Sequence, residues 1–204
     1  MSYLERAITD GHAKLTGEGK QQKILYVAVM RICSDEFPAQ MRPLLVRARG
    51  KWTMPLIIKM LAHFKVPFSI LHDADSPKRR DGSQNGSWTA NTELHTEIGE
   101  ARKVGVRVIH RISVPNFEYV HLPVQRTNAG SLHQISNDDK PWNINKAIME
   151  NEQIRDSIKA LLNDLLFSTA KEEPFNGPFE QGLQNAIKSW VAANGVTDDR
   201  YKFV

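Results

Sequence analysis

A chain of 204 residues, 41% hydrophobic and 25% charged, has the composition of one globular domain or of a domain with a small appendage. Its single cysteine, Cys33, excludes a disulfide framework within the chain, and we expect it to be a core residue. No apolar run approaches the roughly 18 residues that span a bilayer, and the start lacks the apolar segment of a signal peptide. We therefore expect a cytoplasmic protein without a membrane partner; its net charge of +4 is compatible with nucleic acid.

The first third of the chain predicts helices and short strands, the first of them a short strand at residues 12–16. Residues 20–33 have apolar residues at helical spacing, although Leu25 and Val29 also allow a strand. Residues 44–46 are typical of a short buried strand. Residues 54–64 predict a helix, and its expected inward residues are Leu56, Ile57, Met60 and Leu61.

The middle of the chain alternates short apolar runs with helical patterns. The run at 67–71 predicts a buried strand, and the polar stretch 76–87 predicts a loop. A helix is expected over 88–103 and a strand over 106–110, and another helix is expected after the VPNFE stretch at 114–118. This alternation indicates an α/β fold with a mostly parallel central sheet flanked by helices.

The last third is mainly helical. We expect a loop at 125–139, the longest helix at 143–167, a proline-broken loop at 172–179 and a last amphipathic helix at 181–193. This pattern predicts a catalytic core over residues 1–140 and a helical C-terminal extension over 141–204 that packs on the core. The long apolar helix also makes a homodimer plausible.

Acidic residues follow three of the expected strands. In a parallel sheet the carboxyl ends of the strands meet at one edge, so Glu18, Asp73, Asp75 and Glu118 are expected to lie together. In an extended chain Asp73 and Asp75 point to the same side, where two carboxylates favour a shared Mg²⁺ or Mn²⁺. Taken alone, a DxD motif more often begins a solvated loop, Glu18 in its glycine turn is more often surface, and Glu118 is equally typical of a helix N-terminus.

Basic and aromatic residues offer weaker signals. Lys51 follows Gly50 and is a candidate phosphate contact, although GK alone is not a Walker A loop. Lys78, Arg79 and Arg80 form a basic loop that either binds DNA or is simply solvated. Trp88 and Trp142 are able to stack on bases, but packing in the core is the more frequent role. The histidines His63, His110, His121 and His133 lack paired ligand spacing, which predicts no metal site among them.

Six stretches resemble, in order, the C-terminal Toprim nuclease region of the overcoming-lysogenisation-defect (OLD) family. They cover roughly residues 13–150, and the combination of GK before a helix, then HDAD, then WTAN is the specific part of the resemblance. The stretches are GEGKQQKI (17–24), ARGKWTMPLIIKML (48–61), VPFSILHDAD (66–75), DGSQNGSWTANTELHTEI (81–98), VPNFE (114–118) and DKPWNINKAI (139–148).

The resemblance implies a Toprim fold and a two-metal DNA nuclease of the phage-defence type. It makes Glu18, Asp73, Asp75 and Glu118 metal ligands and Lys140 the residue that stabilises phosphate charge. Gln22 stands where the family pattern has a second acid, and Asn116 stands where it often has a serine, which predicts a weak second metal site. Family members usually carry an ABC-type ATPase domain, which we do not expect in this chain because it has no Walker A loop.

Three functions are compatible with this pattern. The leading one is Mg²⁺- or Mn²⁺-dependent hydrolysis of DNA phosphodiesters. The second is a primase- or topoisomerase-like Toprim domain, for which this chain is short. The third is a degenerate Toprim domain that binds nucleic acid or a partner without cutting it, which Gln22 favours.

Overall fold

The centre of the molecule is a pair of parallel strands. The computed structural model describes residues 32–35, 38–39, 44–46, 48, 50–121, 125–126, 132–133, 146–168 and 172–203. Strand β1 (Phe68–Asp73) pairs with β2 (Val108–Ser113), in register from Phe68↔Val108 to Asp73↔Ser113. The expected α/β class is confirmed. Within the described part of the chain the parallel sheet has two strands, and the finer Toprim arrangement stays a prediction.

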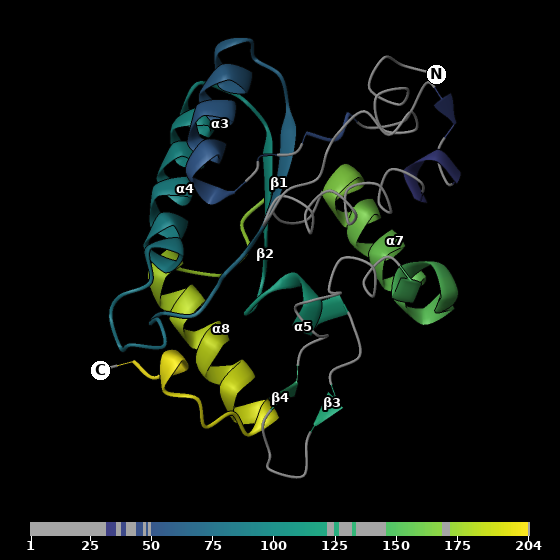
Figure 1. Cartoon of the computed structure of the whole chain (residues 1–204). Coiled ribbons are helices and arrows are strands. Elements are labelled where there is room, and N and C mark those ends of the chain that lie inside the picture. Colours follow the sequence, from purple (N-terminus) through teal and green to yellow (C-terminus); the bar gives the residue numbers. More distant parts are fainter. Residues whose placement is uncertain are drawn as a thin grey trace, which may run out of the picture.

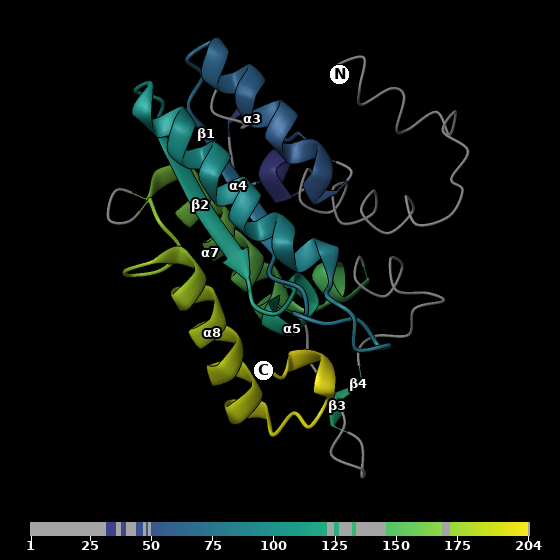
Figure 2. The same cartoon turned by 90° about the vertical axis from the view of Figure 1, so that its left-hand side faces the viewer.

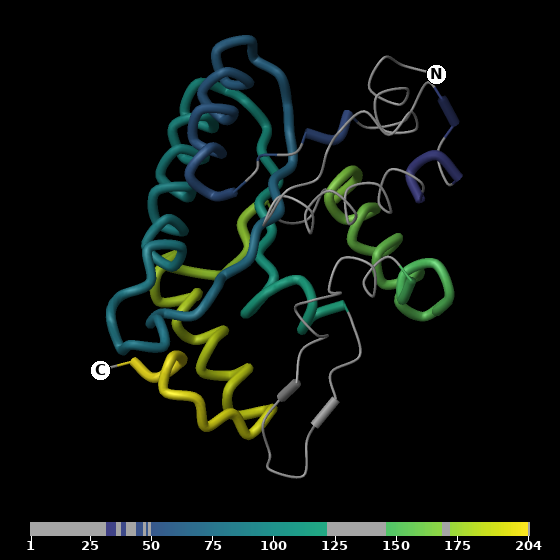
Figure 3. The backbone as a smooth tube through the Cα atoms, in the orientation of Figure 1, coloured from purple at the N-terminus to yellow at the C-terminus, as the bar shows by residue number. Residues whose placement is uncertain are grey.

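Helices cover both faces of this pair (Figures 1 and 2). Helices α3 (Met54–His63) and α4 (Gly86–Lys103) lie on one side, and α7 (Glu152–Phe167) lies on the other and contacts both strands. Helix α8 (Phe179–Asn194) contacts α4, and the short α5 (Phe117–His121) directly follows β2, as the trace in Figure 3 shows.

The alternation of side chains along β1 explains this layering. Ile70 packs with the α3–α4 side of the core, whereas the next residue, Leu71, packs with the α7 side. Because both faces of the strands are covered, apolar residues occur on both, as is usual for parallel sheets. The α3–α4 core contains Ile58, Ile70, Leu94, Ile98, Ala101, Val106 and Val108; the α7 core contains Ile32, Cys33, Phe117, Ile148, Ile154, Ile158 and Leu162.

Helix α4 begins two residues before the expected start. Its first turn is capped by Asn85, whose side chain accepts a hydrogen bond from the Ser87 N–H at 3.1 Å. At the other end, the Val106 N–H bonds to the Ala101 carbonyl at 3.1 Å, and Gly105 has a positive φ of 86°. This closing turn delays the next strand, so β2 begins at Val108 and not at residue 106.

The expected inward face of α3 is wrong in part. Leu56 and Met60 are 65% and 54% exposed, and the residue that the helix buries is Ile58. Met54 and Ala62 pack beside Ile58 because they lie one turn away on the same face. Both candidate stripes are apolar, and only the position of α4 selects between them.

Two other expectations need correction. Residues 44–46 form no strand: Leu44 is 88% exposed, and of the three only Leu45 packs against the core. The helix expected over 143–167 is interrupted at Asn151, whose side chain caps α7 by accepting the Ile154 N–H at 3.2 Å; residues 146–150 form a separate helical segment.

The expected loop at 125–139 contains a short hairpin of β3 (Gln125–Arg126) and β4 (Leu132–His133). The loop at 172–179 and the final helix are confirmed within about two residues. Cys33 is buried, as expected. In the described part of the chain, none of the helices combines the length and apolar character that a membrane crossing needs. The division into a core and an extension at residue 140 stays a prediction.

Candidate functional site

Three predicted acids lie at the edge of the sheet where β1 and β2 end. Asp73 is the last residue of β1, Asp75 lies two residues further on, and Glu118 lies in the first turn of α5, after β2. The two loops are tied together, because the Ala74 N–H bonds to the Ser113 carbonyl at 2.8 Å and the Asp75 N–H to the Pro115 carbonyl at 2.7 Å. We call Asp73, Asp75 and Glu118 the acidic edge.

Asp73 is held in an unfavourable place for a negative charge. Burial raises the pKa of its carboxyl group to about 7, and the charges of Glu118 and Asp75 also act to raise it. The Phe117 N–H donates to Asp73 Oδ1 at 2.8 Å, and this bond and the charge of Lys51 act in the opposite direction. Asp73 is therefore close enough to Glu118 and Asp75 to be repelled by both, and a cation beside it would relieve this repulsion.

Lys51 is buried beside the acidic edge. Its ammonium group lies 2.6 Å from Asp75 Oδ2, 2.8 Å from Asn91 Oδ1, 2.9 Å from the Ser87 carbonyl and 3.3 Å from the Ala74 carbonyl. Burial lowers the pKa of Lys51, while Asp75 acts to raise it. A phosphate contact by Lys51 would require its ammonium group to leave some of these acceptors, so the predicted DNA contact remains a prediction.

The assumption that Asp73 and Asp75 share one side of an extended chain is wrong. Strand β1 ends at Asp73, and Asp75 has a positive φ of 66°, a left-handed conformation that Asp tolerates better than most residues. This turn brings the carboxylate of Asp75 to Lys51. The two aspartates still affect each other electrostatically, but through a folded loop.

The basic loop after the acidic edge folds back on itself. Lys78 and Gln84 form an antiparallel bridge, and the Lys78 N–H also bonds to the Arg200 carbonyl at 3.0 Å. Arg79 and Arg80 are exposed. The loop therefore has a defined shape and presents two guanidinium side chains at its surface.

Trp88, one of the two tryptophans considered for stacking on bases, packs against Phe203, with ring centroids 5.6 Å apart.

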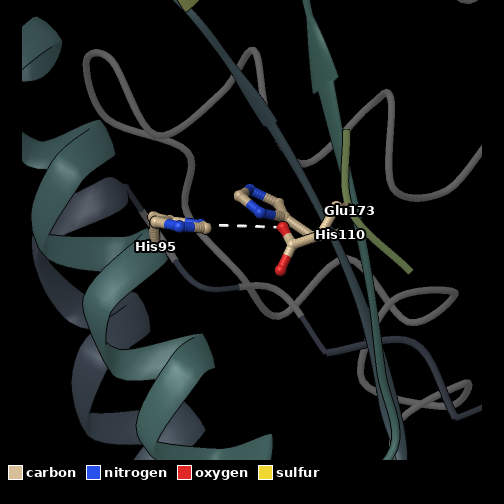
Figure 4. Close-up of side chains that lie close together, drawn as sticks. All are labelled: His95, His110 and Glu173. Atoms are coloured by element: carbon tan, nitrogen blue, oxygen red, sulfur yellow. Dashed lines mark ion pairs between the residues drawn. The ribbon is translucent and has the colours of Figure 1, made fainter. Parts of the chain in front are cut away.

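A second group of side chains, unlike the acidic edge, has ligand atoms at metal-binding distances. Within the described residues, His95, His110 and Glu173 bring one ligand atom each to within 4.8 Å of the others (Figure 4). His110, for which the sequence predicts no metal site, thus belongs to a group that could hold a metal ion. Nothing in the local spacing of these three residues points to this group. The sequence offers one indication: side chains alternate between the two faces of a strand, and His72 and His110 fall on the same face of the neighbouring strands β1 and β2.

The other predicted site residues, Glu18, Gln22 and Lys140, lie outside the described residues. Their roles as metal ligands and as a phosphate-stabilising lysine stay predictions. A comparison of the chain with protein-family models, with curated proteins and with solved structures finds no significant match.

Proposed function

We propose that this chain is a divalent-metal-dependent nuclease that hydrolyses DNA phosphodiesters at the acidic edge, in the manner of an OLD-family Toprim domain. The observation that carries the proposal is the meeting of Asp73, Asp75 and Glu118 at the carboxyl ends of parallel strands, with Lys51 beside them. This edge is where α/β sheets place their ligand sites. The resemblance in the order of sequence motifs adds the Toprim assignment.

The chemistry of the acidic edge suits a hard divalent cation. Its residues offer oxygen ligands, and the repulsion of Asp73 by Glu118 and Asp75 favours binding of Mg²⁺ or Mn²⁺. When bound, such an ion supplies Lewis-acid stabilisation of phosphate charge and a more acidic bound water. Asp73 and Glu118 would hold the ion, Lys51 would keep Asp75 in place, and the resemblance adds Glu18 and Lys140. In the hydrolysis, water adds across a P–O bond and leaves a phosphate monoester and a hydroxyl group.

A plasmid-nicking assay tests the proposal. Supercoiled plasmid incubated with the protein and Mg²⁺ or Mn²⁺ should become relaxed or linear, whereas EDTA should abolish this conversion, because the proposed hydrolysis depends on the divalent cation. A preparation of Asp73→Ala purified in parallel controls for contaminating nucleases. Equal conversion by the variant and the wild type, or conversion in EDTA, contradicts the proposal.

The ion pair of Lys51 with Asp75 favours a second candidate function. It neutralises one of the acids without a metal, as expected of a domain that binds nucleic acid or a partner without cutting it. The same assay distinguishes the two, because such a domain binds plasmid in a gel-shift experiment but leaves it supercoiled with either metal.

Reversing the three positive charges of the basic loop should change how the affinity for DNA depends on salt concentration. If Lys78, Arg79 and Arg80 bind phosphates, replacing all three with Glu removes the counterion release that accompanies each of these ion pairs. We expect the slope of log affinity against log salt to become shallower by about one for each phosphate that the loop no longer neutralises. Fluorescence anisotropy with a labelled duplex over a range of salt concentrations measures the slope.

The matched control reverses three lysines elsewhere. They are the exposed residues Lys59 on α3, Lys65 in the turn after α3 and Lys103 at the end of α4, and their replacement with Glu changes the net charge equally. A slope that falls equally in both triple variants would show a general charge effect and would remove the basic loop from the DNA-binding surface.

A further inference from the structure

The group His95, His110 and Glu173 is built from three separate segments. His95 comes from α4, His110 from β2 and Glu173 from the segment that leads into α8 (Figure 4). The Glu172 carbonyl accepts the backbone N–H of His110 at 2.8 Å, which holds this segment against β2. The ring of His95 stacks on Phe179 with centroids 4.1 Å apart and planes 6° apart, so its orientation is fixed by packing.

A chain of hydrogen bonds leaves one ring nitrogen of His110, Nδ1, without a proton, so that its lone pair is available. The backbone carbonyl oxygen of Asp73 can only accept a hydrogen bond. His72 Nδ1, which lies 3.0 Å from this oxygen, therefore carries the proton and donates the hydrogen bond. His72 Nε2 is then the acceptor in its 2.8 Å bond with His110 Nε2, which must donate. His110 Nδ1 is therefore unprotonated in the neutral ring.

This lone pair has no hydrogen-bond partner among the described residues. His110 is 0% exposed, and its Nδ1 and the Nδ1 of His95 are both buried without a hydrogen bond. Burial lowers the pKa of His110 to about 2, and it lowers the pKa of His95, so both rings favour the neutral form that binds metal ions. Two neighbouring imidazoles with buried, unsatisfied nitrogens are unfavourable unless something binds them.

Glu173 completes the group with a carboxylate. Arg102 Nη1 binds Glu173 Oε1, while Oε2 lies 3.7 Å from His95 Nδ1. Arg102 Nη2 also donates to the Val108 and Glu172 carbonyls, at 2.7 and 2.8 Å, so the guanidinium group is itself fixed. One carboxylate oxygen is thus held by Arg102, and the other faces the two imidazoles.

The group is reachable from a cavity. A pocket of about 140 Å³ is lined by His95 and Glu173 and by the turn and helix start at Pro174, Phe175, Gly177 and Phe179. The pocket is large enough for several water molecules, so an ion can enter and retain water as a further ligand.

We propose that His95 Nδ1, His110 Nδ1 and Glu173 Oε2 bind a Zn²⁺ ion whose remaining position opens into this pocket. Two imidazoles and one carboxylate are a ligand set typical of zinc sites with an open position, and they differ from the hard oxygens that Mg²⁺ prefers. The bonds from the Asp73 carbonyl through His72 to His110 are the outer hydrogen bonds that metal-bound histidines usually make. This zinc site is separate from the acidic edge and does not rest on the proposed nuclease activity.

A competition titration tests the site. EDTA-treated, dialysed protein is titrated with Zn²⁺ against a chromophoric chelator, and the wild type should bind one equivalent. We expect His95→Ala and Glu173→Gln to weaken the affinity by at least roughly 100-fold, because each removes a ligand. Zn²⁺ should also raise the melting temperature of the wild type and not of His95→Ala.

Two control variants make the result specific. His63→Ala removes an exposed histidine at the end of α3, and Glu118→Gln removes an acid of the acidic edge; both should bind Zn²⁺ like the wild type. Both ligand variants alter partly exposed residues, so folding is checked by circular dichroism. No stoichiometric binding by the folded wild type, or equal loss in His63→Ala, would show that the group is only a network of ion pairs around Arg102.

Discussion

Asp73→Asn is expected to lower the plasmid-nicking rate by at least about 100-fold with Mg²⁺ or Mn²⁺. The substitution removes the buried charge that the proposed cation needs, and the loss of about 3 kcal/mol of transition-state stabilisation corresponds to this factor. Asparagine keeps an oxygen that can accept the Phe117 N–H, so the link between β1 and α5 is retained. The rate is measured from the decay of supercoiled plasmid under single-turnover conditions.

The same substitution, Asp73→Asn, should not lower the stability of the fold, although it lowers the nicking rate. A carboxyl group whose pKa rises from 3.8 to about 7 on folding binds its proton more tightly in the folded chain. Its contribution favours folding at low pH and is lost as the pH rises from about 4 through about 7. In EDTA at neutral pH, Asp73→Asn should therefore melt at or above the temperature of the wild type.

The matched control is Asp81→Asn. Asp81 is exposed in the basic loop, and its carboxylate accepts from the Ser83 N–H at 2.9 Å, which asparagine can also do. This variant should cut at the wild-type rate. If Asp73→Asn cuts equally fast, Asp73 is not in the active site. If it is slow and also melts well below the wild type, the reduced activity reflects damage to the fold.

Lys51→Met should lower the free energy of unfolding by about 3 kcal/mol. Methionine keeps most of the length of the side chain but leaves Asp75, Asn91 Oδ1 and the Ser87 carbonyl without their buried donor. Breaking a buried ion pair from one side costs about 3–5 kcal/mol, and we expect the lower end because the Asp75 side chain is 35% exposed and regains water. For a chain of this size the melting temperature should fall by about 6–12 °C.

The control for Lys51 is Lys59→Met. Lys59 also forms an ion pair, 2.9 Å from Glu97, but its side chain is 63% exposed. Exposed pairs contribute little, so this variant should unfold within about 1 kcal/mol of the wild type. Urea titrations at one pH compare the three proteins. If both methionine variants unfold at the same urea concentration, Lys51 contributes no more to the free energy of unfolding than a surface lysine. Its contacts with four acceptors then do not stabilise the fold.

The sequence by itself was sufficient for the elements whose signals are local. The apolar run ahead of HDAD predicted β1, and the helical spacing of Leu94 and Ile98 predicted α4, because the period of apolar residues reflects the local backbone. The rule that parallel strands place their carboxyl ends at one edge also predicts that Asp73, Asp75 and Glu118 lie together, as they do in the structure.

Only the tertiary structure decided which faces are buried and which side chains meet. The choice of Ile58 over Leu56 on α3 depends on where α4 lies, and the four acceptors of Lys51 come from positions 23 to 40 residues away in the chain. The group of His95, His110 and Glu173 likewise joins α4, β2 and the segment before α8. Such contacts depend on how distant elements pack, and no local period or spacing in the sequence records that packing.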